Sequence, residues 1–451
     1  MPNPQIPVVK YCIVTFGCRV NQADSIQIEE QLIASGGSSS AAHEADLVVV
    51  NTCSVTASAD QATRQIVRKI ARENPGARIV LTGCYATRRP DDVVGLAERV
   101  QVVSNDRKEK LAAEAGLVQP STAERFGDGD GACGAEIAPG LAGRTAFTLR
   151  VQTGCDATCS FCIIPSTRGT GRSRPVHEVL SELGRVGRAG FREIAITGVH
   201  LGSYGCDLGD GATLFGLLKA IERGAAGLRV RISSLEPMDC SDDIVDLVAE
   251  SDCFAPHFHL PLQHASDALL VAMQRPYTLA YYRRLVDRIR RRIPHASIGS
   301  DIIAGFPGET DADVDLMASY LADSQLTHLH VFPYSDRPGT VAAALPGKVH
   351  GAIVRERASR LRSIGRELTR RFHRSQDGAV RPGLTIEDGS LVVTDNYLKV
   401  RIPPGRVRNE WVTVRVCVAG DALEATVIAA NHESKTTNHL PTTNHQLPTT
   451  N

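Results

Sequence analysis

A loop with three closely spaced cysteines constrains this chain most. Cys155, Cys159 and Cys162 follow an apolar stretch, with three residues between the first two and two residues between the last two. Three thiolates can hold three corners of a cubane iron–sulfur cluster, which leaves the fourth iron without a protein ligand. An open metal position is where a substrate or cofactor binds and reacts. The loop therefore predicts a reactive metal centre.

Two other interpretations of this loop stay open, namely three unrelated buried thiols or a zinc site. The spacing differs from both ferredoxin spacings, which supply a fourth cysteine. It also differs from a zinc ribbon, because no second Cys-x-x-Cys pair follows. The cysteines lie in a glycine-bearing loop rather than on an apolar face, which favours the cluster.

Length and composition bound the class of protein. A chain of 451 residues should hold two or three domains, and its net charge of zero means that any affinity for nucleic acid must come from a local patch. Twelve cysteines in this length are too few for a disulfide scaffold. The first residues lack a charged segment followed by an apolar one, and no apolar run reaches membrane-spanning length. We expect a protein of the reducing cytoplasm with no membrane partner.

Residues 8–118 are predicted to form an N-terminal α/β domain. Short apolar strands that alternate with helices are typical of a parallel, doubly wound sheet. The expected strands are Val8–Phe16, Leu47–Val50 and Ile79–Leu81, and the expected helices are Ala23–Ala34 and Ser58–Glu73.

Each of these strands runs directly into a cysteine. Cys18, Cys53 and Cys84 follow the three strands, and a glycine precedes two of them. Because the carboxyl ends of parallel strands meet at one edge, where such sheets bind ligands, the three thiols are predicted to meet there as a second metal site. The alternative is three buried, inert cysteines. Cys12 lies inside a strand and is interpreted as a core residue.

Residues 119–144 are predicted to be a linker, because Gly, Ala and Asp dominate and no periodicity is present. Cys133 within it is interpreted as incidental. The polar, repetitive tail 431–451 is expected to be disordered.

Residues 145–375 resume the alternation and predict a partial (β/α)6 barrel, whose active site lies at the carboxyl ends of its strands. Gly198, Glu236, Gln263 and Gly305 follow such strands and are assigned to the rim of the cofactor site, although a loop turn or helix cap explains each one singly. The expected strands are Ala146–Gln152, Glu193–Thr197, Leu228–Ser233, His257–Leu262, Ser297–Ile303 and His328–Phe332, and the helices are 176–189, 213–222, 242–250, 278–292 and 310–323.

A helical pattern over residues 353–374 is dense in arginine. Arg355, Arg362, Arg366 and Arg370 are predicted to contact RNA phosphates, and the alternative for each is a solvated helix face. Residues 376–430 then predict a small closed β-barrel, an architecture often used to bind nucleic acid. Its expected strands are Leu384–Ile386, Leu391–Thr394, Leu398–Ile402, Trp411–Cys417 and Leu423–Ala429.

The cysteine loop resembles the signature of the radical S-adenosylmethionine (SAM) superfamily, including an aromatic residue, Phe161, before the last cysteine. From Tyr11 to Ala429 the order of domains resembles the methylthiotransferases, whose last module is the TRAM domain. The resemblance implies an α/β protein with an N-terminal doubly wound domain, a radical SAM partial barrel and a TRAM-like β-barrel.

Three local motifs resemble the class that acts on N6-threonylcarbamoyladenosine beside the tRNA anticodon: Gly17–Gln22, Gly198–Gly205 and Ser233–Pro237. The classes that act on isopentenyladenosine or on a ribosomal protein usually carry Met-Asn-Glu or Pro-Lys-Asn after the first cysteine. One departure is Gln263-His-Ala-Ser266, where the family usually has Gln-Ser-Gly-Ser.

The resemblance implies two [4Fe-4S] clusters and SAM as cofactors. Cys155, Cys159 and Cys162 would hold the cluster that binds SAM, and Phe161 would join the four rim residues above in binding the cofactor. Cys18, Cys53 and Cys84 would hold the cluster that carries the sulfur. The implied partners are tRNA and an electron donor such as a flavodoxin or ferredoxin.

Two alternatives from other classes stay open. One is a radical SAM enzyme with a single cluster and structural N-terminal cysteines. The other is a non-catalytic RNA-binding protein with a zinc site. Within the family, isopentenyladenosine in tRNA is the alternative substrate.

Overall fold

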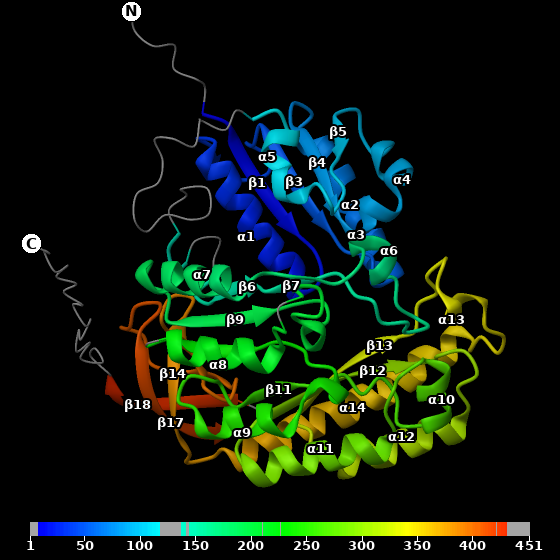
Figure 1. Ribbon diagram of the computed structural model, residues 1–451, viewed down its shortest axis with the longest axis vertical. Helices are drawn as coiled ribbons and strands as arrows, with labels where there is room; N and C mark the ends of the chain where they lie inside the picture. The colour runs from blue at the N-terminus through cyan, green and yellow to red at the C-terminus, as the bar shows by residue number, and fades with distance from the viewer. Residues whose placement is uncertain are drawn as a thin grey trace, which may run out of the picture.

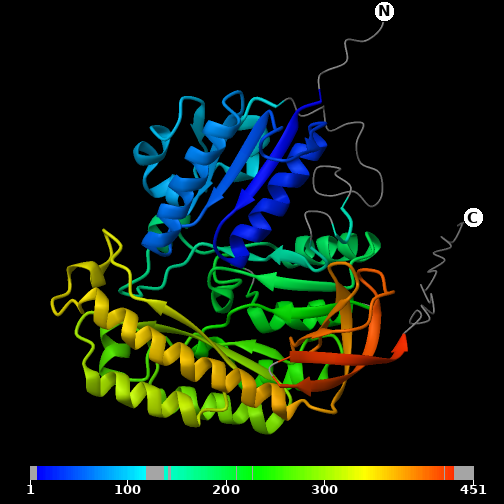
Figure 2. The same ribbon diagram turned by 180° about the vertical axis from the view of Figure 1, so that it is seen from behind.

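The structure is a computed structural model that describes residues 8–117, 137–140, 144–209, 211–225, 227–420 and 422–430. Figure 1 shows three parts: a blue α/β domain, a green and yellow strand–helix unit, and an orange to red β-barrel. Figure 2 shows from behind that the arrowheads of the blue strands point toward the strand–helix unit. The predicted linker lies almost wholly outside the described residues, as do Cys133 and the tail.

The N-terminal sheet is parallel throughout and has the order β2-β1-β3-β4-β5. Val48 and Val50 of β3 pack on one face with Val67 of α2, whereas Val49 packs on the other face with Ile28 of α1. Alternate residues of a strand point to opposite faces, so an unbroken apolar strand is covered by helices on both sides. The elements are β1 (Lys10–Thr15), α1 (Arg19–Ala34), β2 (Ser38–Ser39), β3 (Leu47–Thr52), α2 (Ala57–Glu73), β4 (Arg78–Gly83), α3 (Cys84–Arg88), α4 (Pro90–Val94), β5 (Val100–Val102), the 3-10 helix η1 (Lys108–Lys110) and α5 (Leu111–Glu114).

The central unit has two three-stranded parallel sheets, β10-β9-β6 and β11-β12-β13, joined by a parallel bridge from Val230 to Phe254. This arrangement confirms the partial barrel. The strands are β6 (Phe147–Arg150), β9 (Glu193–Thr197), β10 (Arg229–Ile232), β11 (His257–His259), β12 (Ser297–Ala304) and β13 (His328–Pro333), with a short ribbon of β7 (Gln152–Thr153) and β8 (Arg172–Ser173). The helices are α6 (Ile164–Arg168), α7 (Val176–Arg188), α8 (Leu214–Gly224), α9 (Asp242–Glu250), α10 (Asp267–Ala272), α11 (Leu279–Arg292), α12 (Asp311–Asp323), α13 (Val341–Ala344) and α14 (Gly351–Ser375).

The C-terminal strands close into a barrel of order β14-β15-β16-β18-β17, as predicted. Val392, Val400, Val412 and Val414 are fully buried in its core. Arg231 of β10 fixes the barrel to the central unit, because its guanidinium donates to the carbonyl oxygens of residues 394 and 395 at 2.8 Å. The strands are β14 (Val380–Ile386), β15 (Leu391–Thr394), β16 (Lys399–Arg401), β17 (Trp411–Ala419) and β18 (Ala422–Ala430).

Helix α1 differs from its prediction, because it begins at Arg19 rather than at Ala23. Its first residues bury the polar Asn21 and Asp24 beside Val20 and Ala23, and this mixture of buried side chains weakens the hydrophobic periodicity. The predicted strand 257–262 also ends early, at His259. Within the described ranges, none of the helices has the length and apolar character needed to span a bilayer.

Candidate functional site

The structure places Cys18, Cys53 and Cys84 within three residues of the carboxyl ends of β1, β3 and β4, as the alternating pattern predicts. Two glycines let these loops approach one another. Gly17 has a φ of +89°, and a Cβ there would lie 2.6 Å from the sulfur of Cys53. Gly83 has a φ of +93°, and a Cβ there would lie 2.2 Å from the carbonyl oxygen of residue 52. Only glycine tolerates such contacts in this backbone conformation.

The three N-terminal thiols share one electrostatic environment. Burial raises the pKa of Cys53 to about 12, and the charges of Cys18 and Cys84 act in the same direction. All three cysteines are free of disulfides. Thiols must lose their protons to bind metal, and a cation supplies the charge that makes this favourable. The donor set therefore fits a metal cluster with three protein ligands.

The loop after β6 holds the second set, Cys155, Cys159 and Cys162. The backbone N–H groups of Ala157 and Ile164 donate to the sulfurs of Cys155 and Cys162 at 3.4 and 3.5 Å. Burial raises the pKa of Cys162 to about 12, and the two neighbouring thiolates act in the same direction. Such N–H···S contacts adjust the potential of a cysteine-bound cluster, so this donor set also fits one.

Three side chains outside the predicted site residues contact these sulfurs or their partners. Arg275 is buried and donates to the sulfur of Cys159 at 3.0 Å, and it also pairs with Glu236, one of the predicted rim residues. His200 lies 3.8 Å from the sulfur of Cys155, and its Nε2 lies 2.8 Å from Asp239. Each partner is at least 39 residues away in the chain, so no local pattern identifies it.

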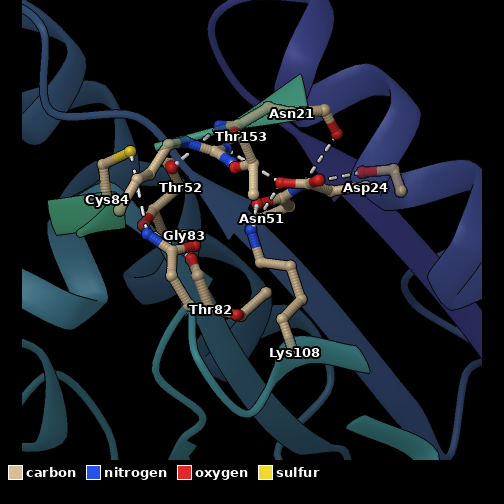
Figure 3. A network of polar contacts seen from close by, with 12 residues as sticks. Asn21, Asp24, Asn51, Thr52, Thr82, Gly83, Cys84, Lys108 and Thr153 are labelled. Carbon is tan, nitrogen blue, oxygen red and sulfur yellow. Dashed lines mark hydrogen bonds and ion pairs between the residues drawn. The ribbon is translucent and has the colours of Figure 1, made fainter. Parts of the chain in front are cut away.

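A buried ion network joins the two cysteine sites. Asp24 of α1 receives hydrogen bonds from Lys108 at 2.9 Å and from Arg168 at 2.8 Å, and it also pairs with Arg150. Figure 3 shows Asp24, Asn21 and Lys108 directed toward one another beside the loop that carries Cys84. Arg168 ends the helix that follows Cys162, so a single carboxylate ties the two loops together.

The folded protein strongly favours the ionised form of the Asp24 carboxyl group. Burial alone raises the pKa of a carboxyl group, but the attraction of Lys108, Arg168 and Arg150 outweighs it and holds the pKa of Asp24 well below its usual range. A second junction contact joins the domains at Asp60, which pairs with Arg88 at 2.8 Å and with Arg337 of the central unit. The junction is thus held by buried, paired charges.

A cavity of about 190 Å³ adjoins Cys162. Phe161 and Gln263, both predicted to bind the cofactor, line it together with Val55 and Thr56, which closely follow Cys53. Gln263 has a φ of +67°. The other two predicted rim residues lie elsewhere: Gly198 lines a neighbouring cavity, and a Cβ at Gly305 would lie 2.4 Å from Val354 of α14. The structure therefore brings two of the five predicted cofactor residues to one cavity.

The neighbouring cavity is larger, at about 700 Å³. It shares Asp301 and Phe332 with the smaller one. His259, Asp301 and His330 form a group within the described residues that could hold a metal ion. Here Asp301 contacts both imidazoles, at 3.0 and 3.2 Å, and although burial raises its pKa, these hydrogen bonds lower it to about 2.

The arginines of helix α14 differ in their surroundings: some form ion pairs within the fold, and others line pockets. Arg357 is ion-paired with Glu309 at 2.8 Å and supports the fold. Arg362, Arg366 and Arg370 line one groove, which shares Thr369 and His373 with the 700 Å³ cavity. Arg355, the fourth arginine predicted to contact RNA, lines a different pocket together with Gly305.

Two family descriptions match the chain. "Uncharacterized protein family UPF0004" matches residues 10–105, and "Radical SAM superfamily" matches residues 149–321. The solved structure of the radical SAM methyltransferase TsrM from Kitasatospora setae has a TM-score of 0.53 and 16% identity, over 75% of this chain and 74% of that one. The fold and the cysteine loop thus define a radical SAM protein, a class that binds SAM and a [4Fe-4S] cluster.

Curated relatives narrow this class. The threonylcarbamoyladenosine tRNA methylthiotransferase MtaB of Bacillus subtilis (strain 168) is 33% identical over 86% of this chain and 88% of its own length. The Thermotoga maritima protein of the same name is 33% identical over 90% and 93%. The tRNA-2-methylthio-N(6)-dimethylallyladenosine synthase of Streptomyces coelicolor is 32% identical over 94% and 86%. The chain belongs to the methylthiotransferase family of radical SAM enzymes.

Proposed function

We propose that this enzyme inserts a methylthio group at carbon 2 of N6-threonylcarbamoyladenosine in tRNA, with two [4Fe-4S] clusters and SAM as cofactors. The observation that carries the proposal is the pair of three-cysteine sites tied together by Asp24 and Arg168. Relatives named for this activity are 32–34% identical over 86–90% of the chain.

The chemistry explains why the family uses cofactors. An aromatic carbon–hydrogen bond offers no acidic proton, so side-chain acid–base catalysis cannot open it. When bound, the clusters and SAM supply a radical that removes the hydrogen atom and a sulfur that takes its place. The protein's own residues hold the two sites at a fixed separation and exclude water from the junction. Asp24, Arg168 and Asp60 keep the separation of the two sites fixed, because they join the loops through buried contacts.

Metal analysis tests the two-cluster proposal. The anaerobically purified protein is expected to hold about eight irons and eight sulfides per chain, and the triple Cys18→Ala, Cys53→Ala, Cys84→Ala variant about four. Cys417→Ala is the control, since this exposed cysteine lies in the C-terminal barrel. About four irons in the unaltered protein would favour a radical SAM enzyme with a single cluster. Zinc in place of iron would favour an RNA-binding protein.

Nucleoside analysis tests the substrate. tRNA from cells that lack the gene is expected to lose the methylthio mark from threonylcarbamoyladenosine, as measured by mass spectrometry of digested tRNA. Re-expression of the intact gene restores the mark. The second candidate is isopentenyladenosine, which is also called dimethylallyladenosine. Relatives named for that nucleoside are 30–32% identical over 94–95% of the chain. Loss of the mark from isopentenyladenosine alone would establish that candidate instead.

A further inference from the structure

The 700 Å³ cavity is built from all three parts of the chain. Cys18 and Arg19 line it from the N-terminal domain, and Tyr397 and Lys399 line it from the C-terminal barrel. Residues of the central strands also line it, among them Asp301, which lines the 190 Å³ cavity as well. A volume of this size holds a nucleoside. The cavity thus contacts one cysteine of the first site and adjoins the 190 Å³ cavity beside Cys162.

The charged side chains that line the cavity differ in whether they already have a partner of opposite charge. Asp301 already contacts two imidazoles, as described above. Arg19 donates at 2.8 Å to the hydroxyl of Tyr397, a neutral group, and its guanidinium lies 5.8 Å from the centre of that ring. Within the part of the chain that the structure describes, no carboxylate forms an ion pair with Arg19 or with the exposed Lys399. Arg19 and Lys399 therefore line the cavity without a carboxylate that pairs with either of them.

The walls also offer flat apolar surfaces. Phe332 is 39% exposed, and Tyr397 lies against His257 with 4.6 Å between ring centres. Bases that are turned out of RNA stack on aromatic and histidine side chains. The groove of Arg362, Arg366 and Arg370 adjoins the cavity through Thr369 and His373, so a path for the RNA backbone leads to it.

We infer that this cavity holds the target nucleoside, and that Arg19 and Lys399 bind the carboxylate of its threonyl group. The inference rests on the proposed function and specifies how the substrate is selected. Threonylcarbamoyladenosine carries a carboxylate that charge-assisted hydrogen bonds can bind. An isopentenyl group carries no charge and offers neither cation an anionic partner, so it gains none of this binding energy.

Binding of synthetic RNA tests the inference. Three anticodon stem-loops differ only in the target adenosine: one carries the threonylcarbamoyl group, one carries its uncharged carboxamide, and one is unmodified. Fluorescence anisotropy with the anaerobically prepared enzyme measures each dissociation constant. We expect the carboxylate to bind about tenfold more tightly than the carboxamide for each cation that contacts it. Arg19→Met and Lys399→Met are each expected to lose about tenfold of this preference.

Two controls separate charge from structure. Arg19→Lys keeps the charge and should keep most of the preference, and Arg401→Met removes an exposed cation from the same strand as Lys399 but outside the cavity. Affinity for the unmodified stem-loop reports whether each variant still folds and binds RNA. If Arg19→Met fails this check, Lys399→Met carries the test, since Lys399 is exposed.

The outcomes distinguish the inference from the proposed function. If the double Arg19→Met, Lys399→Met variant keeps the full preference for the carboxylate, the inference is wrong, whereas the proposed function stands. If the unaltered enzyme binds carboxylate and carboxamide equally, no cation selects the substrate, and the inference is again wrong. If the unaltered enzyme instead methylthiolates an isopentenyladenosine stem-loop and leaves the threonylcarbamoyl one unchanged, the proposed function itself falls.

Discussion

Replacing Asp24 by Asn is expected to lower the free energy of unfolding by about 3–5 kcal/mol, the usual cost of removing one partner from a buried ion pair. The variant would leave Lys108, Arg168 and Arg150 close together without their shared anion. Their side chains are 4%, 3% and 10% exposed, so water cannot compensate for the lost charge. The urea midpoint, followed by circular dichroism, measures the effect.

Asp315→Asn is the matched control. Asp315 also lies on a helix and pairs with an arginine, Arg360, at 2.6 Å, but both side chains are more than half exposed. Exposed pairs contribute about 0–1 kcal/mol, so this variant should unfold close to the unaltered protein. Equal midpoints for the two variants would contradict the idea that the Asp24 network holds the junction.

The difference in stability between the unaltered protein and Asp24→Asn depends on pH, and the direction of the pKa shift of Asp24 determines how. Because the folded protein lowers the pKa of Asp24, the ionised carboxylate contributes stability above its unfolded value of about 3.9. That contribution is lost as the pH falls through the folded pKa. The difference in stability between the unaltered protein and Asp24→Asn should therefore narrow below about pH 4. It should stay constant between pH 6 and 8.

Sequence reasoning places the cysteines well, for a physical reason. Parallel strands end at one edge of their sheet, so the cysteines after β1, β3 and β4 must come to the same rim whatever their separation in the chain. The strand Glu193–Thr197 likewise agrees residue for residue with its prediction, because it is buried on both faces and bounded by turns. A regular strand pattern and a position just after a strand can both be recognised from neighbouring residues in the sequence.

The side chains around the two cysteine sites carry no such signal. Lys108 contacts Asp24 across 84 residues, and Arg168 contacts it across 144. Neither arginines nor lysines are expected in a core, and only the folded chain reveals that one carboxylate offsets their charge. Gly305 illustrates a different limit: its place after a strand predicts a cofactor loop, and no local signal indicates that a Cβ there would lie 2.4 Å from Val354 of α14.

Replacing Gly17 by Ala is expected to abolish the proposed N-terminal cluster and to leave the proposed cluster at Cys155, Cys159 and Cys162 intact. The new Cβ would lie 2.6 Å from both the Cβ and the sulfur of Cys53, so one of the two loops must move. Iron content should fall from about eight to about four per chain. Reductive cleavage of SAM should continue, because the loop from Cys155 to Cys162 is unchanged.

Gly36→Ala separates steric conflict from backbone strain. Gly36 has a φ of +81°, close to the +89° of Gly17, but a Cβ at this position would have no other atom within 4 Å beyond its immediate chain neighbours. Both variants incur the cost of a left-handed backbone, about 1–2 kcal/mol, and only Gly17→Ala forces a cysteine aside. Iron content that stays near eight in Gly36→Ala and falls in Gly17→Ala assigns the loss to the contact with Cys53. If both variants lose iron equally, backbone strain alone explains the loss, and the close approach of Gly17 to Cys53 does not set the geometry of the cluster.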